Sequence, residues 1–434
     1  MHMKALFAEI WVALAMGLLA WAGVALLTNE SIIDDWLVAI ASNAADQRLD
    51  SGAGTTKAAS VGIILIDDDA LRDELQRSQN DQSVDRIASA YRTISSKLLA
   101  IAQSDGKARA VVLDFYPSPF ADVAPKDTPI NVDCRLPVIQ VALPPPSPFG
   151  QEFVRPDPRF IDPASPCSLV AYSFANQAAE GEKLRTVEHN PMPKAVGCPV
   201  LSLSSSAFAL AASGSHTDSG LGGQPCQRQQ ALRQRCADLP PCQSALQKRM
   251  PLTEPPQNLS VRLANDFFDP AFSEDARQWL TGRVVFIGSS NTQSDDFYHL
   301  ADGSIGDALG LTAQPSGKTW PGVVVHAGLT QRLLQVTASG TEAIRYLDWK
   351  LNLVLGVIIA ILMAFFDRHD VSRPSARGIL LWTTLAFAAL LALALILAGF
   401  TALIVNFVLA LFGLAIAGAI IWLIRGGQRA TITA

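Results

Sequence analysis

Several signatures of common enzyme classes are absent from this 434-residue sequence. It contains neither the G-x-S-x-G turn of α/β-hydrolases nor the H-E-x-x-H zinc motif. Gly317-Lys318-Thr319 resembles the end of a phosphate-binding loop, but Thr312 stands where that motif requires a glycine. The six cysteines include no C-x-x-C pair, which disfavours a zinc site. We therefore expect neither an enzyme nor a bound cofactor.

Positive charge is slightly outnumbered by negative charge and unevenly placed along the chain. The net charge is −5, and no basic patch suits a nucleic acid. No lysine or arginine occurs between Lys4 and Arg48, whereas 367–377 contains three arginines and 425–434 contains two. Because cations accumulate on the cytoplasmic side of membrane segments, this distribution predicts cytoplasmic termini and an extracytoplasmic middle region.

Long apolar runs, by contrast, lie at both ends of the sequence. A spanning helix needs about 20 mostly apolar residues. Four segments approach or exceed that length: 5–27, 351–366, 379–398 and 402–424. The second is short, but Tyr346, Leu347 and Trp349 extend it as an interfacial collar. The sequence therefore predicts one transmembrane helix before the middle region and three after it.

A cleaved signal peptide is the alternative for the first run. We favour an anchor, because the run is longer than the usual apolar core of a signal peptide. The expected organisation is an anchor at 1–28, an extracytoplasmic domain at 29–345, three transmembrane helices within 346–424 and a short cytoplasmic tail at 425–434.

All cysteines fall in the expected extracytoplasmic region. An even number confined to an exported domain predicts disulfide bonds. Six cysteines allow many pairings, so the connectivity stays open. The residues concerned are Cys134, Cys167, Cys198, Cys226, Cys236 and Cys242.

The middle region has the pattern of an α/β domain. The run 60–66 is apolar on both faces, which predicts a buried strand of a parallel sheet. Further strands are expected at 108–113, 259–263, 282–287 and 323–325. Helical spacing is found at 87–102, 201–212, 273–280 and 328–336. We predict a largely parallel, three-layer sheet. The Cys-, Pro- and Ser-rich stretch 116–256 is expected to be a disulfide-linked excursion around the sheet.

Polar residues follow four of the expected strands. Ligands of open parallel sheets bind beyond the carboxyl ends of the strands, so we predict a ligand site there. Its candidate residues are Asp67, Asp68, Asp114, Gly288, Ser289, Ser290, Asp295, Asp296 and His326. Each has a structural alternative, since an Asp after a strand often caps a helix, a Gly forms turns and a His can be buried in a core. Weaker alternatives are metal binding or acid–base work by Asp67, Asp114 and Asp296 and hydrolysis by Asp67, Asp114 and His326.

Several segments in order resemble the landmark segments of CHASE2 extracellular sensory domains. They are 60–71, 108–114, Cys198-Pro-Val-Leu-Ser-Leu-Ser, 282–290 and 321–327. One apolar run before the domain and three after it are also typical of that family. The resemblance covers about 35–336. It implies a ligand sensor that feeds cytoplasmic signalling modules.

These observations predict a receptor in the bacterial inner membrane. Because 425–434 is too short for an output module, we expect signalling to a separate cytoplasmic or membrane protein. The alternative is a membrane effector or scaffold, in which the outer domain drives assembly and the helices act in the lipid bilayer. Small residues recur every four positions at 413–419, which keeps a homodimer open. The identity of the ligand is not predicted.

Overall fold

A computed structural model divides the chain into two units, each described here by itself. The sheet unit comprises 49–302 and 314–342, and the helical unit comprises 1–48, 303–313 and 343–434. The structure describes residues 37, 40, 41, 44, 61–77, 86–104, 108–115, 136–143, 156, 161, 168–173, 186–188, 198–212, 224–239, 242, 249–251, 259–271, 273–290, 297–299, 319–339, 345–367, 376–401, 403–407, 409–411, 413, 414 and 416.

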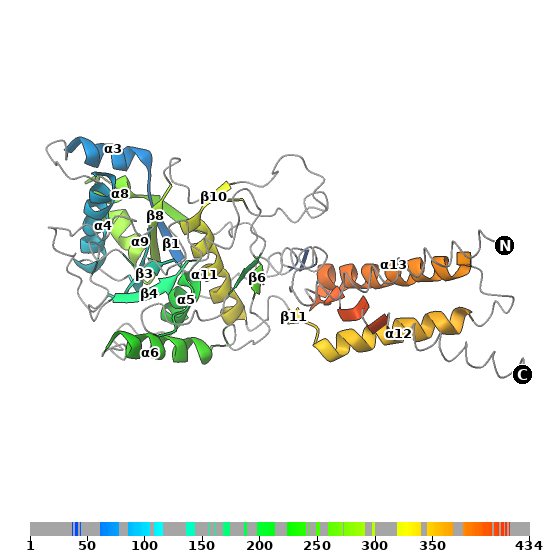
Figure 1. The fold of residues 1–434 in the computed structure, drawn as a ribbon. Coiled ribbons are helices and arrows are strands. Elements are labelled where there is room, and N and C mark those ends of the chain that lie inside the picture. Colours follow the sequence, from blue (N-terminus) through cyan, green and yellow to red (C-terminus); the bar gives the residue numbers. More distant parts are fainter. Residues whose placement is uncertain are drawn as a thin grey trace, which may run out of the picture. The chain divides into compact units, whose positions relative to one another are not determined.

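A six-stranded sheet forms the centre of the sheet unit (Figure 1). Its strand order is β4-β3-β2-β8-β1-β7, and every neighbouring pair is parallel. The strands are β1 (Val61–Ile66), β2 (Ala110–Asp114), β3 (Val138–Ala142), β4 (Ser168–Tyr172), β7 (Ser260–Leu263) and β8 (Val284–Ser289). The strands between the two edges are buried on both faces, which explains their continuous apolar runs.

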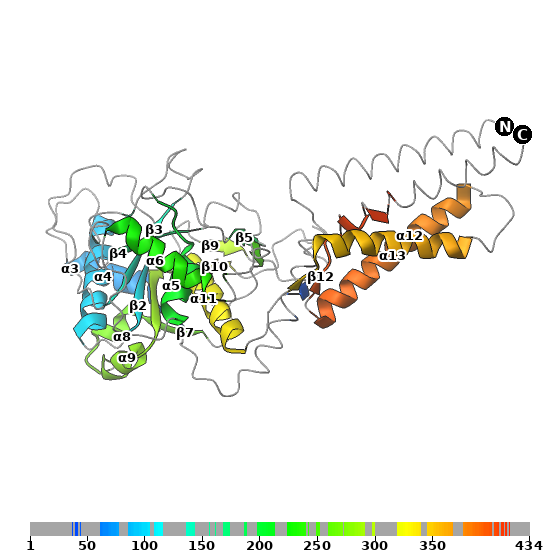
Figure 2. The same ribbon diagram turned by 90° about the horizontal axis from the view of Figure 1, so that it is seen from below.

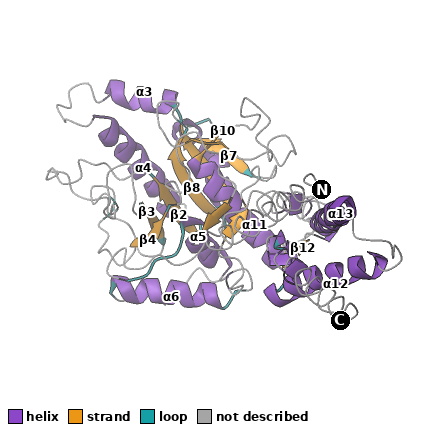
Figure 3. Cartoon of the chain, turned by 45° about the vertical axis from the view of Figure 1, so that its right-hand side comes forward, coloured by secondary structure: helices purple, strands orange, loops and turns teal. Residues whose placement is uncertain are grey.

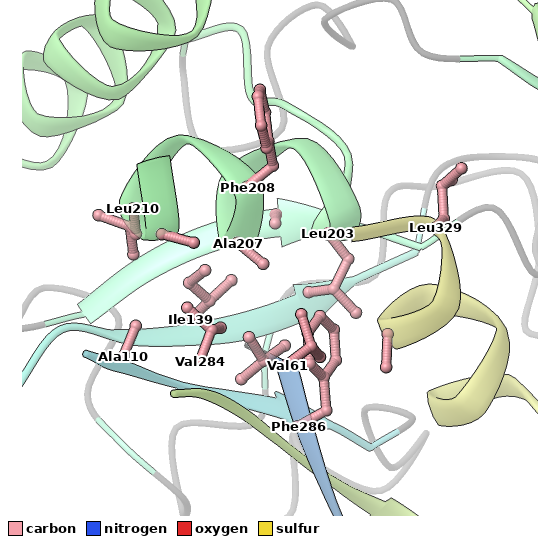
Figure 4. Packing of buried hydrophobic residues seen from close by; sticks show 14 of the residues in the cluster. Val61, Ala110, Ile139, Leu203, Ala207, Phe208, Leu210, Val284, Phe286 and Leu329 are labelled. Atoms are coloured by element: carbon pink, nitrogen blue, oxygen red, sulfur yellow. The ribbon is translucent and has the colours of Figure 1, made fainter. Parts of the chain in front are cut away.

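Three helices belong to the first face of the sheet. They are α5 (Leu203–Ala212), α6 (Pro225–Ala237) and α11 (Gly322–Ser339). In Figure 4, Ala207 of α5 lies over Ile139 and Val284 of the sheet, and Leu203 lies over Val61 and Phe286. Nine of the ten residues of α5 are buried, because the helix lies between the sheet, α6 and α11.

Four helices belong to the other side of the unit. They are α3 (Asp68–Arg77), α4 (Arg86–Ser104), α8 (Ala264–Phe268) and α9 (Ser273–Leu280). Residues of α4, α8 and α9 share one apolar cluster with the second face of the sheet. Gly62 of β1 allows close packing there, since a Cβ atom at this position would lie 2.5 Å from the Trp279 ring. The domain is therefore the expected three-layer arrangement (Figures 2 and 3).

The stretch 116–256 corrects one expectation. Instead of passing around the sheet, it supplies β3, β4 and the buried helix α5. It also contains two disulfides, Cys198–Cys226 and Cys236–Cys242. Cys134 and Cys167 lie outside the described residues.

A second correction concerns the expected strand at 323–325. These residues form the first turn of α11, and the strand before them is β10 (Thr319–Pro321), which pairs with β9 (Phe297–His299). An apolar run of this length fits a buried helix as well as a buried strand. A further small sheet joins β5 (Thr186–Glu188) to β6 (Arg249–Pro251).

The helical unit contains α12 (Trp349–Asp367) and α13 (Ala376–Thr401). Strand β11 (Arg345–Tyr346) precedes α12 and pairs with β12 (Leu403–Ile404), which follows α13. The described residues between 407 and 416 are helical, so the fourth expected helix begins later than position 402. Among the described residues, no helix meets the length and hydropathy of a membrane span. The transmembrane segments therefore stay a prediction, and 1–28 lies outside the described residues.

Candidate functional site

The carboxyl ends of β1, β8 and β2 lie side by side. The register pairs Ile66 with Ser289 and Asp114 with Gly288. The backbone N–H of Ser290 also donates to the Ile66 carbonyl over 3.2 Å. Residues that are far apart in the sequence therefore meet at one edge of the sheet, and His326 is the only described candidate not at a strand end.

The ends of β1 and β8 form a topological switch point. Helices α3 and α4, which follow β1, pack on the second face of the sheet, whereas α11, which follows β8, packs against the first face. Where the connections of two adjacent parallel strands leave in opposite directions, a crevice opens between them at their carboxyl ends. This geometry, rather than any single residue, makes the edge a candidate binding site.

Ser289 joins the end of β8 to helix α4. Its Oγ lies 2.6 Å from the Tyr91 hydroxyl, a hydrogen bond between residues almost two hundred positions apart. The Tyr91 ring in turn contacts Phe115, which directly follows β2, at a centroid distance of 5.5 Å. The sequence pattern includes Tyr91 only as one apolar position of an amphipathic helix. Its hydroxyl carries no spacing signal, so its role appears only in three dimensions.

Asp67 has the role of a helix cap. Its Oδ1 accepts the N–H of Ala70 over 2.9 Å, which satisfies one donor of the first turn of α3. Asp68 is exposed in that turn, where its charge favours the positive end of the helix. The structural alternative thus accounts for Asp67, and Asp68 borders the edge without facing its interior.

Asp114 is the buried carboxylate of the site. Strand alternation directs it and Gly288 to the face covered by α11, opposite to the face of Ser289. Gly288 allows that helix to approach, because a Cβ atom there would lie 2.5 Å from the Val323 Cβ. The edge thus offers a carboxylate on one side of β8 and paired hydroxyl groups on the other.

His326 belongs to a buried network on α11. Its Nε2 lies 3.0 Å from the Oγ of Ser173, which follows β4. The His326 carbonyl accepts bonds from the hydroxyls of Ser204 and Thr330. Burial lowers the pKa of His326 to about 3, so the imidazole is neutral at physiological pH. A Ser–His pair suggests a nucleophile and base, but both side chains are buried, which favours a structural role.

Two candidates remain. Asp295 and Asp296 are outside the described residues. Within the part of the chain that the structure describes, no group of three acidic, His or Cys side chains could hold a metal ion.

Comparison with known families decides the assignment. The model of the CHASE2 domain matches residues 11–365, which is most of the chain. The chain belongs to the CHASE2 family. Because CHASE2 domains are extracellular sensory domains, this chain carries a sensory domain of extracytoplasmic type, consistent with a non-catalytic role. No curated protein and no solved structure matches the chain.

Proposed function

We propose that the protein is a membrane-anchored receptor whose CHASE2 domain detects an extracytoplasmic ligand or protein. The recognition site is the switch point at the ends of β1, β8 and β2. The observation that carries this proposal is the position of Ser289, between α4, reached through Tyr91, and α11, which packs on the adjacent Gly288. A ligand bound there contacts elements of both faces of the sheet.

In this proposal, binding favours one arrangement of the membrane segments over another, as any ligand-driven change requires. A separate cytoplasmic or membrane protein then reads the change. The apolar segments 5–27, 351–366, 379–398 and 402–424, together with their flanking cations, support the membrane location. Residues 349–367 and 376–401 are helical, which agrees with two of these segments.

The recognition site is tested by a thermal-shift screen of the full-length protein in mild detergent. Small polar metabolites are added singly, and stabilising compounds are retested on Tyr91→Phe and Ser289→Ala. We expect these variants to weaken binding about tenfold each, because each removes one hydroxyl from the site. Ser95→Ala is the matched control, since it removes a buried hydroxyl one turn away on the same helix.

The results separate the site from its alternatives. Equal shifts in all variants would show that recognition occurs elsewhere in the domain. If no compound acts, affinity purification of the tagged protein tests a protein ligand and the output partner together. Recovery of this protein alone, as an oligomer, would instead support the membrane effector or scaffold.

A further inference from the structure

The connection between α13 and the helical residues after it is tied to the start of α12. Within the helical unit, β12 pairs in parallel with β11, joining Arg345 to Leu403 and Tyr346 to Ile404. The N–H of Leu347 continues the ladder by donating to the Ile404 carbonyl over 2.9 Å. Strand β11 follows closely on the last residues of the sheet unit, which ends at 342.

Two asparagines reinforce this connection. The Asn352 Oδ1 accepts the N–H of Asn406 over 3.1 Å, and its Nδ2 donates to the Leu347 carbonyl over 2.9 Å. Asn406 in turn caps the following helical turn, since its Oδ1 accepts the N–H of Leu409. Asn352 is only 1% exposed. A buried amide in apolar surroundings is costly unless its bonds are made, so this arrangement is strongly specified.

One helical turn further on, two glycines bring the backbones together. A Cβ atom on Gly356 would collide with the backbone of Ala410 and Leu414. A Cβ atom on Gly413 would lie 2.5 Å from the Leu353 carbonyl oxygen. The first turns of α12 and the helical residues after Asn406 are therefore in direct backbone contact, because no side chains separate them at these glycines.

The segment before the sheet unit reaches the same place. Leu37 and Ala41 are fully buried in one apolar cluster with Ala398, Ile404 and Phe407. Ile40 lies beside Gly399, where a Cβ atom would lie 3.8 Å from its Cγ2. Both described segments that flank the sheet unit in sequence thus contact residues 398–407.

We propose that residues 398–407, termed the β12 junction, couple the sensory domain to the helical residues that follow Asn406, termed the last helix. The junction carries a conformational change in the sensory domain into that helix. The inference rests on the proposed receptor function. A displacement of β11 acts on Asn406 through Ile404 and through Asn352 in the first turn of α12. It therefore reaches the last helix without passing along the length of α12 or α13. The junction also contacts the 37–44 segment. It therefore touches the described segments on both sides of the sheet unit in the sequence.

The test uses hydrogen–deuterium exchange on the full-length protein in nanodiscs, without a ligand. Val323→Ala, which loosens α11 beside Gly288, serves as the perturbation in the sheet unit. In the wild-type background we expect faster exchange at 345–349 and about tenfold faster exchange at 403–411, because one or two hydrogen bonds weaken. With Asn352→Leu added, exchange should still be faster at 345–349 but should no longer be faster at 403–411. Leu351→Ala, at an exposed neighbouring position, is the control and should leave transmission intact.

A second variant guards against simple loss of structure. Tyr346→Cys with Ile404→Cys links register partners covalently, and it should restore transmission in the Asn352→Leu background, whereas either cysteine alone should not. Transmission to 403–411 that survives Asn352→Leu would overturn the junction. Faster exchange in α12 or α13 with none at 403–411 would also overturn it, while leaving a receptor that signals by another route. No change anywhere in the helical unit would contradict the receptor itself.

Discussion

At the scale of single residues, His326 is a buried base held neutral by its surroundings. Burial lowers its pKa from 6.5 to about 3. In the unfolded chain the imidazole takes up a proton near pH 6.5, whereas the folded protein does not. The stability it contributes is therefore complete above pH 6.5 and is lost as the pH falls from 6.5 towards 3.

We expect acid sensitivity to depend on this residue. Wild-type protein should lose about 2 kcal/mol from this group alone between pH 7.5 and 5, since 1.5 pH units lie below the unfolded pKa. His326→Gln retains a donor towards Ser173 and cannot titrate, so its free energy of unfolding should fall less. Urea titrations of both proteins at the two pH values measure the difference. Equal losses would show that the imidazole gains a proton or a partner in the folded state.

Gly288 gives a second prediction at this scale. Gly288→Ala places a methyl group where Val323 lies, so we expect a loss of about 1–3 kcal/mol in the free energy of unfolding. The double variant with Val323→Ala should recover part of that loss, because the new methyl group then has room. A double-mutant cycle measures the coupling, and purely additive losses would contradict the contact.

At the scale of elements, two disulfides attach to helix α6, one near each end. Cys198–Cys226 closes a separation of 28 residues and ties α6 to the segment before α5, whereas Cys236–Cys242 closes only 6. The Gln229 side chain of α6 also donates to the Val170 carbonyl of β4 over 2.8 Å. The longer disulfide therefore holds in place the helix that bonds to an edge strand of the sheet.

Loss of the longer disulfide should be the more harmful. Chain-entropy estimates give about 3–4 kcal/mol for the longer loop and about 1 kcal/mol less for the shorter one. Cys198→Ala with Cys226→Ala should thus lower the unfolding temperature further than Cys236→Ala with Cys242→Ala. Calorimetry of both pairs checks this order, and the reverse order would mean that α6 is held mainly at its carboxyl end.

Elements outside the Pro- and Ser-rich stretch 116–256 could largely be predicted, whereas the strands inside it could not. β1, β2, β7 and β8, with helices α4 and α9, lie within a few residues of the predicted ranges. β3 and β4 were missed, because the Pro-, Ser- and Cys-rich sequence around them is typical of loops. Val323–Val325 was wrongly predicted as a strand, since a short buried run fits either structure.

The same limit applied to the candidate site. Asp114 and Ser289 could be predicted to lie close together, because each ends a strand and the parallel topology places these strand ends side by side. Tyr91 reaches them from a helix, and Ser173 reaches His326 from beyond β4. Such partners depend on side-chain direction in the folded state, which spacing along the sequence does not encode.

At the scale of the whole molecule, the receptor proposal fixes the orientation of the chain. Alkaline phosphatase, active only after export, should be active when fused at position 340 and inactive when fused at 370 or 434. A fluorescent protein that matures only in the cytoplasm should show the opposite pattern. Activity of the phosphatase at 370 would reverse the assignment of the arginine-rich loop 367–377.

The central position of β8 bears on how the domain is made. This strand pairs with both β1 and β2, yet it follows them by well over a hundred residues. In the proposed receptor, a middle region that crosses the membrane in sequence order exposes β1 and β2 while β8, their shared neighbour, has yet to cross. The sheet cannot close until residue 289 has crossed, and contacts of such long range make folding slow. Biogenesis of this domain should therefore depend on chaperones that shield unpaired strands during translocation.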